Sequence, residues 1–158
     1  MNPMIPLRLL PAAVCLAVLT ACTVDRAPMV AYEPVDAYSW DAAERLVFDL
    51  GPVPASGDYG LTLHVRTTTA AAFPFQVLYV EVRQQWNASK TCLVDTVACA
   101  FQHDERRASG ISLHQYAFPF SHRRCQAMDS VRLTVRHLMR KEEITGIDNV
   151  GIELVPAE

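Results

Sequence analysis

The sequence lacks the common marks of a nucleic-acid-binding protein, a hydrolase, a nucleotide-binding enzyme or a zinc protein. Lys and Arg number 14 against 17 Asp and Glu, a formal net charge of −3, and this balance argues against nucleic acid as a partner. No Gly-x-Ser-x-Gly elbow, glycine-rich phosphate loop or Cys-x-x-Cys pair occurs. We therefore expect no catalytic residues, no metal and no other cofactor.

Histidine is present at five positions, but without the spacing of a metal site. Ordinary surface placement explains His64, which lies near Asp58 on one predicted strand. Acidic pairs occur at 104–105 and 142–143, and neighbouring side chains on a strand point apart. We expect these pairs to be solvated charges rather than an acid–base couple.

The apolar stretch at 9–19 is far shorter than the ~20 residues that a permanent transmembrane helix needs. It follows Arg8 and ends at Leu19-Thr20-Ala21-Cys22. A positive start, a short apolar middle and small residues before a cut are typical of an export signal. The last four residues match the lipobox of lipoproteins, so we expect residues 1–21 to be cleaved and Cys22 to be lipidated.

Lipid attachment at Cys22 would hold the mature protein at a membrane, because two or more acyl chains, such as palmitate, suffice for stable anchoring. Residue 23 is Thr, not the Asp that resembles an inner-membrane retention signal, so we expect the outer membrane. Which face of that membrane is left open. Residues 22–43 contain Pro28 and Pro34 and show no apolar period, which predicts a tether. Trp40, near its end, is expected to pack on the domain.

Three cysteines remain after the leader and the lipid site, namely Cys92, Cys99 and Cys125, and an odd number leaves at least one unpaired in a monomer. Cys92 and Cys99 flank a predicted strand and would lie ~23 Å apart, too far to form a disulfide. A disulfide from Cys125 to either of them and a set of buried free thiols both stay open.

Residues 44–158 are predicted to form an all-β domain. Apolar and polar residues alternate at 59–65, 77–83 and 131–136, which is the period of a half-buried strand. Further strands are expected at 46–50, 91–100, 110–120 and 150–154, and no convincing helical period occurs. About seven to eight short strands favour a two-sheet antiparallel sandwich or a jelly roll.

The C-terminal stretch carries a family resemblance. It contains Met139-Arg140, a loop that ends in Gly146-Ile147, and Val150-Gly151-Ile152-Glu153. This order resembles the end of the gliding-motility lipoproteins of the GldH type, from Bacteroidetes. Three upstream features agree with the same family: Trp40, the strand Tyr59…Leu63…Arg66, and Phe73-Pro74-Phe75. The sequence departs from the family pattern at Val77, where the family often has Asn, and in the segment 102–110.

The resemblance implies a lipid-anchored, non-enzymatic envelope protein that acts as an accessory or structural component of an outer-membrane protein assembly. It supplies no catalytic residues. The physical properties of the motif residues give them structural roles: Gly146 and Gly151 permit positive φ or close backbone approach, and Pro74 fixes a strand entry. Arg140 at a strand end can pair with an acidic neighbour or a carbonyl.

A surface glycan-binding jelly-roll module is the alternative function. Such a site needs flat, exposed aromatic side chains, and its candidates are Trp86 beside Asn87, and Phe118 with Phe120. The cluster His122-Arg123-Arg124 is a candidate contact for lipid phosphate or an acidic partner, although a solvated loop is its default interpretation. Short O-glycosylation patterns surround Thr96 and Ser130, and the sequence does not decide whether they are used.

Overall fold

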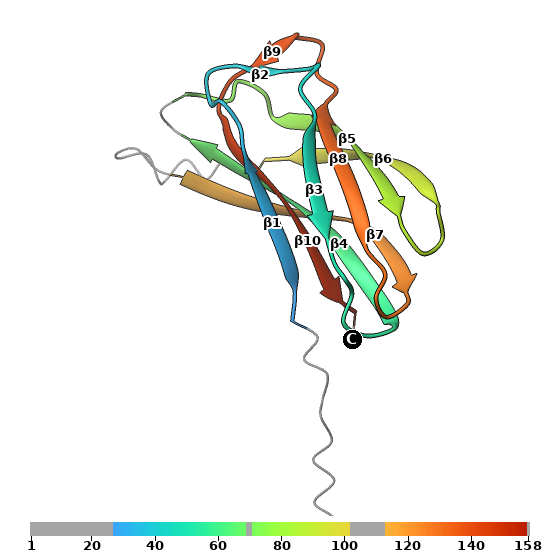
Figure 1. Cartoon of the computed structure of the whole chain (residues 1–158). Helices are drawn as coiled ribbons and strands as arrows, with labels where there is room; N and C mark the ends of the chain where they lie inside the picture. The colour runs from blue at the N-terminus through green and yellow to red at the C-terminus, as the bar shows by residue number, and fades with distance from the viewer. Residues whose placement is uncertain (1–26, 69–70, 102–112, 158) are drawn as a thin grey trace, which may run out of the picture.

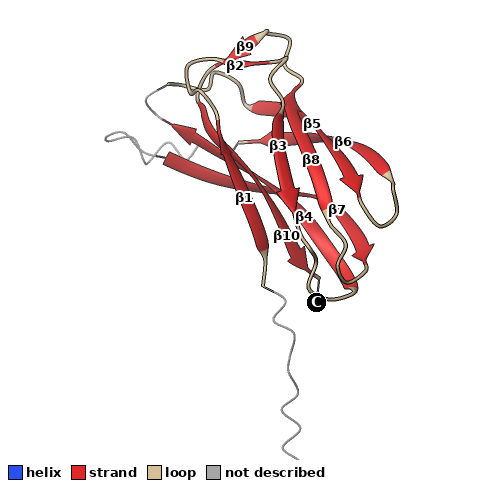
Figure 2. Cartoon of the chain, viewed as in Figure 1, coloured by secondary structure: helices blue, strands red, loops and turns tan. Residues whose placement is uncertain are grey.

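Two four-stranded antiparallel sheets make up the fold (Figures 1 and 2). The computed structural model describes residues 27–68, 71–101 and 113–157. One sheet has the order β1-β10-β4-β7, the other has the order β3-β8-β5-β6, and β2 pairs with β9 at one end. The strands are β1 (Met29–Pro34), β2 (Trp40–Asp41), β3 (Leu46–Leu50), β4 (Gly57–Thr68), β5 (Val77–Trp86), β6 (Cys92–Ala100), β7 (Leu113–Cys125), β8 (Val131–His137), β9 (Glu143–Ile144) and β10 (Ile147–Pro156).

The strand order identifies the sandwich as a jelly roll. If only the eight long strands are numbered along the chain, one sheet has the order 1-8-3-6 and the other 2-7-4-5. This interleaving of first and last strands is the double Greek key of jelly rolls. The all-β prediction is confirmed, and the described residues contain no helix that could cross a bilayer.

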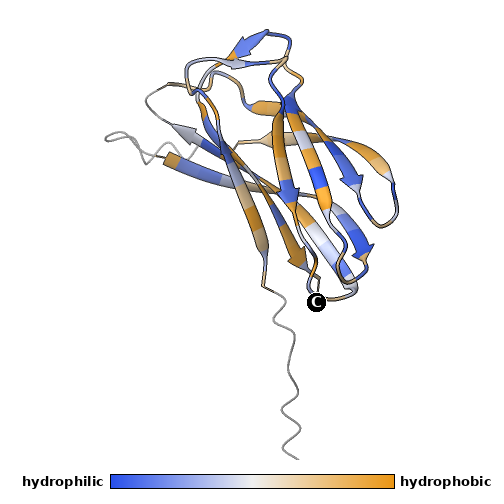
Figure 3. Cartoon of the chain, in the orientation of Figure 1, coloured by the Kyte–Doolittle hydropathy of each residue, from blue (hydrophilic) through white to orange (hydrophobic). Residues whose placement is uncertain are grey.

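The core lies between the two sheets and follows from the alternation in the sequence (Figure 3). Leu61, Leu63 and Val65 point inward from β4 and are at most 1% exposed. The same alternation buries every second residue of β5 and β8, and it buries Val150, Ile152 and Leu154 of β10. Since successive side chains of a strand point to opposite faces, the other residues are left for the outer surfaces of the sheets.

The predicted tether requires a correction, because part of it belongs to the domain. Strand β1 pairs with β10 from Met29 opposite Leu154 to Pro34 opposite Asn149. Trp40 is fully buried and begins β2. No clear alternation marks β1, since it is an edge strand whose residues are mostly half-buried, and Pro34 is tolerated at such an edge. The domain therefore begins at residue 29, not 44. The leader and Cys22 lie outside the described residues.

Strand β7 also differs from the prediction, because it continues to Cys125 and includes the basic cluster that was expected in a loop. His122 and Arg124 are exposed, whereas Arg123 between them is half-buried. The alternation of a strand therefore continues through these three polar residues. Because all three residues are polar, no alternation of apolar and polar residues indicated that the strand continues there.

Gly146 lies where two loops meet with no room for a side chain. Its φ is +90°, and a Cβ atom there would lie 2.3 Å from the backbone nitrogen of Phe73. Its N–H donates to the carbonyl of Ala37 over 2.7 Å, and its carbonyl accepts from the N–H of Thr68 over 3.1 Å. The backbone of one residue therefore joins three segments at the end of the sandwich that carries β2 and β9.

We predict that Gly146→Ala lowers the free energy of unfolding by about 3 kcal/mol, because a positive φ is strained for alanine and the added Cβ meets backbone. Gly60→Ala is the matched control: its φ is not positive, and its Cβ would lie 3.4 Å from a flexible His122 ring. We expect a change of about 1 kcal/mol at most there. Urea unfolding measures both, and equal losses would contradict the structural role of Gly146.

His137 at the end of β8 fixes Trp40 at the same end. Its Nε2 lies 3.0 Å from the carbonyl of Trp40, and the N–H of Met139 donates to its Nδ1 over 3.3 Å. The two bonds together require a neutral ring with the proton on Nε2. Desolvation lowers the pKa of His137 below its ordinary value of 6.5, because burial penalises the imidazolium.

Between the lowered pKa and 6.5, the unfolded chain binds more protons than the folded one, so His137 makes stability fall as pH falls through this window. We predict a lower free energy of unfolding at about pH 5.5 than at about pH 7.5. The difference should shrink in His137→Gln, which cannot titrate. An unchanged difference would show that other groups cause the pH dependence.

Candidate functional site

Side chains from four strands meet on the outer face of the β1-β10-β4-β7 sheet. The register places Tyr32 of β1 beside Gly151 of β10, Gly151 beside His64 of β4, and His64 beside Ala117 of β7. Directly opposed residues of antiparallel strands share a face. Tyr32, His64 and Ala117 therefore lie in one row, on the side of the sheet away from the core.

A polar network crosses this row. His64 Nε2 lies 2.8 Å from a carboxylate oxygen of Glu153, and its Nδ1 lies 3.4 Å from the amide nitrogen of Gln115. The guanidinium of Arg66 donates through Nε to the amide oxygen of Gln115 over 2.9 Å. His64 is only 8% exposed although it is on an outer face. Its neighbours cover it, so ordinary surface placement does not describe it.

Tyr32 lies over Gly151 and closes one side of the network. A Cβ atom on Gly151 would be 2.4 Å from the Tyr32 ring, so only glycine leaves room for it. The guanidinium carbon of Arg66 lies 4.1 Å from the centroid of the same ring, within the range of a cation–π contact. Tyr32, His64, Arg66, Gln115 and Glu153 are called the outer-face network below.

The chemistry of the outer-face network suits binding. Its charged and amide groups hold one another in place. Among the described residues, Glu153 bonds His64 through one oxygen and Arg66 bonds Gln115 through Nε, and a carboxylate and a guanidinium have further acceptor and donor positions. A preordered set of this kind lowers the entropic cost of binding. Among the described residues, no group of three or more His, Cys, Asp or Glu is placed to hold a metal ion.

Only some residues of this network lie in segments that the sequence had marked as characteristic. Arg66, Gly151 and the following Glu153 belong to segments that carry the family resemblance. His64 and Gln115 share a face with them only through strand register, which the sequence does not show. Tyr32 was placed in the predicted tether. Sequence reasoning therefore found single positions and missed their convergence.

Trp86 is not an exposed aromatic platform, and the expectation that it contacts a ligand with a flat surface is wrong. It is 2% exposed, and its indole N–H donates to the amide oxygen of Gln84 over 2.9 Å. It continues the inward series of β5, where every second residue from Leu78 is buried. That parity was visible in the sequence. Phe118 and Phe120 are half-buried and pack against the core.

The three cysteines are free, without a disulfide among them. Cys99 and Cys125 are buried, and burial raises the pKa of the Cys99 thiol to about 12 and that of Cys125 to about 11. Such thiols are inert at neutral pH. Cys92 is exposed at the beginning of β6. The open choice is thus settled in favour of buried free thiols at two of the three positions.

The remaining motif residues lie apart from the outer-face network. Tyr59 is buried and its hydroxyl donates to the carbonyl of Ala55 over 2.8 Å, and Val150 is buried in β10. The thioether of Met139 accepts from the N–H of Tyr79 over 3.5 Å. Pro74 and Arg140 are exposed, Pro74 in the loop before β5 and Arg140 in the loop after β8. Thr96 is exposed and Ser130 half-buried.

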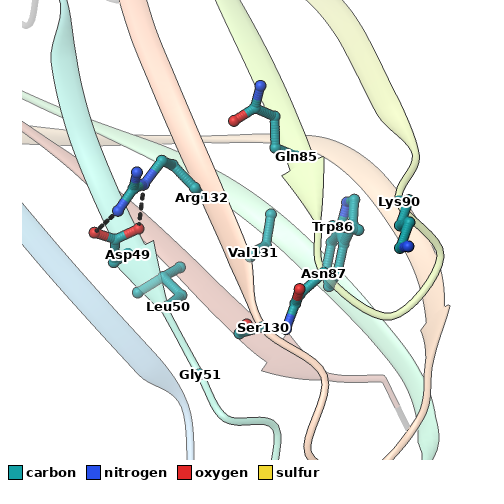
Figure 4. A pocket seen from close by; sticks show the side chains of 10 residues that line it. All are labelled: Asp49, Leu50, Gly51, Gln85, Trp86, Asn87, Lys90, Ser130, Val131 and Arg132. Atoms are coloured by element: carbon teal, nitrogen blue, oxygen red, sulfur yellow. Dashed lines mark hydrogen bonds and ion pairs between the residues drawn. The ribbon is translucent and has the colours of Figure 1, made fainter.

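A second feature is a hollow of about 450 Å³ at the end of the β3-β8-β5-β6 sheet (Figure 4). Arg132 and Asp49 form a two-bond ion pair at its side, with distances of 2.7 and 3.0 Å. This guanidinium lowers the pKa of Asp49. The lining is polar and apolar in about equal parts and consists of Asp49, Leu50, Gly51, Gln85, Trp86, Asn87, Lys90, Ser130, Val131 and Arg132.

The comparison with known families decides the relationship that the motifs suggested. The model of the GldH lipoprotein family matches residues 29–154, which is most of the chain. The chain belongs to the GldH lipoprotein family. The match begins at the first residue of β1 and ends within β10, so the family unit and the jelly roll coincide. No curated protein matches the sequence.

Three solved structures show distant likeness to this GldH-family domain. Latent dimeric PorU from Porphyromonas gingivalis is 11% identical, with a TM-score of 0.35, over 82% of this chain and 13% of that protein. A cycloalternan-forming enzyme from Listeria monocytogenes is 12% identical, with a TM-score of 0.35, over 80% of this chain and 11% of that protein. A protein in the structure of infectious bursal disease virus, Gx strain, is 13% identical, with a TM-score of 0.30, over 83% of this chain and 32% of that protein. No functional argument follows from likeness at this level.

We predict that Gly151→Ala lowers the free energy of unfolding by about 1–3 kcal/mol, because its methyl group displaces the Tyr32 ring. A double-mutant cycle isolates this cause. In the Tyr32→Ala background the same substitution should cost much less, since the colliding ring is gone. Additive losses in the cycle would show that Tyr32 does not explain the need for glycine.

Proposed function

We propose that this GldH-family lipoprotein is a non-enzymatic envelope component that is anchored in the outer membrane through lipid on Cys22. It binds a protein partner of an envelope assembly through the outer face of the β1-β10-β4-β7 sheet. The family membership supports the lipid anchor and the envelope role. The convergence of Arg66, Gly151 and Glu153 on one face is the observation that carries the partner surface.

The surroundings of the outer-face network favour a protein partner. Ala117 and Pro119 of β7 are exposed beside it, and their small side chains let a partner approach the sheet closely. Strand β7 is also an edge strand of its sheet among the described residues, since its one described strand neighbour in that sheet is β4. An edge strand and a preordered polar set together offer both backbone and side-chain contacts to a protein.

A photo-cross-linking amino acid at Ala117 tests the proposal. Ala98 of β6 is the matched control, since it is an exposed alanine on the outer face of the opposite sheet. We predict that position 117 forms a defined protein adduct in cells and that position 98 does not. Equal adducts from both positions would contradict a partner surface on the proposed sheet.

The anchor is tested in the same cells. Cys22→Ala removes the lipid site, and we expect it to abolish the adduct at position 117 because the domain leaves the membrane. If the chain with intact Cys22 is folded and held at the membrane but forms no adduct at position 117, the result would contradict the protein partner and favour the glycan-binding alternative. That alternative has lost Trp86 as a stacking platform, and the hollow around Asp49, Gln85 and Arg132 is its remaining place.

A further inference from the structure

Three loops that are joined by hydrogen bonds form a surface at the end of the sandwich where β1 begins. They are residues 51–56, 87–91 and 126–130, and together they are called the end platform. Asp129 joins them: its carbonyl accepts from the N–H of Val53 over 2.7 Å, and its carboxylate accepts from the N–H of Ala88 over 2.9 Å. Asp129 is only 5% exposed, so the connection is internal to the platform.

The end platform contains both non-glycine residues with positive φ in the described part of the chain, Met128 at 68° and Lys90 at 50°. Met128 is 73% exposed, the highest value among the large apolar residues described, and its N–H donates to the carbonyl of Val53 over 2.8 Å. Left-handed backbone is unfavourable for side chains other than Gly, Asn and Asp. The fold therefore holds one apolar and one cationic side chain outward from strained positions.

Basic residues occur in the end platform and at the adjoining end of β7. The guanidinium of Arg123 lies 4.9 Å from the Trp86 ring and donates to the hydroxyl of Ser89 over 2.7 Å, which fixes it beside Lys90's loop. Arg124 is exposed. Asp58 is an exposed carboxylate at this end. Among the described residues here, Lys90, Arg123 and Arg124 stand against Asp58 and the buried Asp129, since Asp49 and Arg132 neutralise each other, which leaves an excess of one positive charge.

The position of the anchor brings this end to the membrane. Cys22 precedes Met29 by seven residues, a span of about 25 Å at full extension. Met29 pairs with Leu154, and the end of β10 pairs with the start of β4, whose own neighbour is the basic end of β7 (Figure 1). A strand of ten residues is about 33 Å long, so the β2–β9 end lies much farther from the lipid.

We propose that the end platform docks on anionic phospholipid headgroups of the membrane that holds the anchor. Met128 enters the interface between headgroups and acyl chains, and Lys90, Arg123 and Arg124 lie near the phosphates. An apolar side chain flanked by cations is the chemistry that such a surface binds. This inference rests on the proposed lipid attachment at Cys22. It adds a fixed orientation, with the outer-face network held away from the bilayer and open to a partner.

The test uses the full lipidated chain in vesicles of phosphatidylethanolamine and phosphatidylglycerol with brominated acyl chains, which quench nearby tryptophan. Trp40 and Trp86 are buried, so a tryptophan at Met128 reports its own depth. Tyr38→Trp is the control, because Tyr38 is exposed at the opposite end beside β2. We expect Met128→Trp to lose emission and shift to the blue, and Tyr38→Trp to do neither. Equal responses would overturn the docking.

A charge-reversal pair tests the basic contacts. Lys90→Glu with Arg124→Glu should reduce the quenching at position 128, whereas Lys141→Glu at the far end should leave it unchanged. Flotation of the chain with vesicles separates the two proposals. A chain that does not float would show that the lipid anchor is missing. A chain that floats without quenching at position 128 would leave the anchor intact and overturn only the docking.

Discussion

The close approach of β1 to β10 at Gly151 is the constraint on which the outer surface of the molecule depends. Gly151 has no side chain, so Tyr32 can lie across it and meet Arg66 from the neighbouring strand. The contact attaches the edge strand to the middle of its sheet. It also completes the polar network around His64 and Glu153. The absence of a side chain at Gly151 thus determines both how β1 packs on its sheet and which side chains meet on the outer face of that sheet.

The two ends and two sheets of the jelly roll have different characters. One end is closed by backbone bonds around Gly146 and by Trp40 against His137. The other end is built around Asp129 and exposes Met128 and Lys90 in neighbouring loops. If the second end rests on the lipid as proposed, the outer face of the β1-β10-β4-β7 sheet stands upright on the membrane. A lipid anchor then sets the direction from which a partner arrives.

Sequence periodicity predicted the strands that have a clear inward face. Leu61, Leu63 and Val65 show why, because their alternation is a local property of the chain. It could not predict β1, whose pairing depends on β10 more than a hundred residues later. The burial of Trp86 could have been predicted by extending the alternation of buried residues along β5. The partnership of His64 with Glu153 could not, because only the register of two distant strands brings them within 2.8 Å.

The central claim is that the outer face of the β1-β10-β4-β7 sheet is covered by a protein in the envelope. Amide hydrogen exchange of the lipidated chain tests it, with native envelope membranes compared against the same chain in detergent. The account predicts slower exchange in the membranes for β7, residues 113–125, whose edge a partner would pair, and unchanged exchange for β6, residues 92–100, an edge strand of the other sheet. Equal exchange of β7 in both states would contradict a covered face.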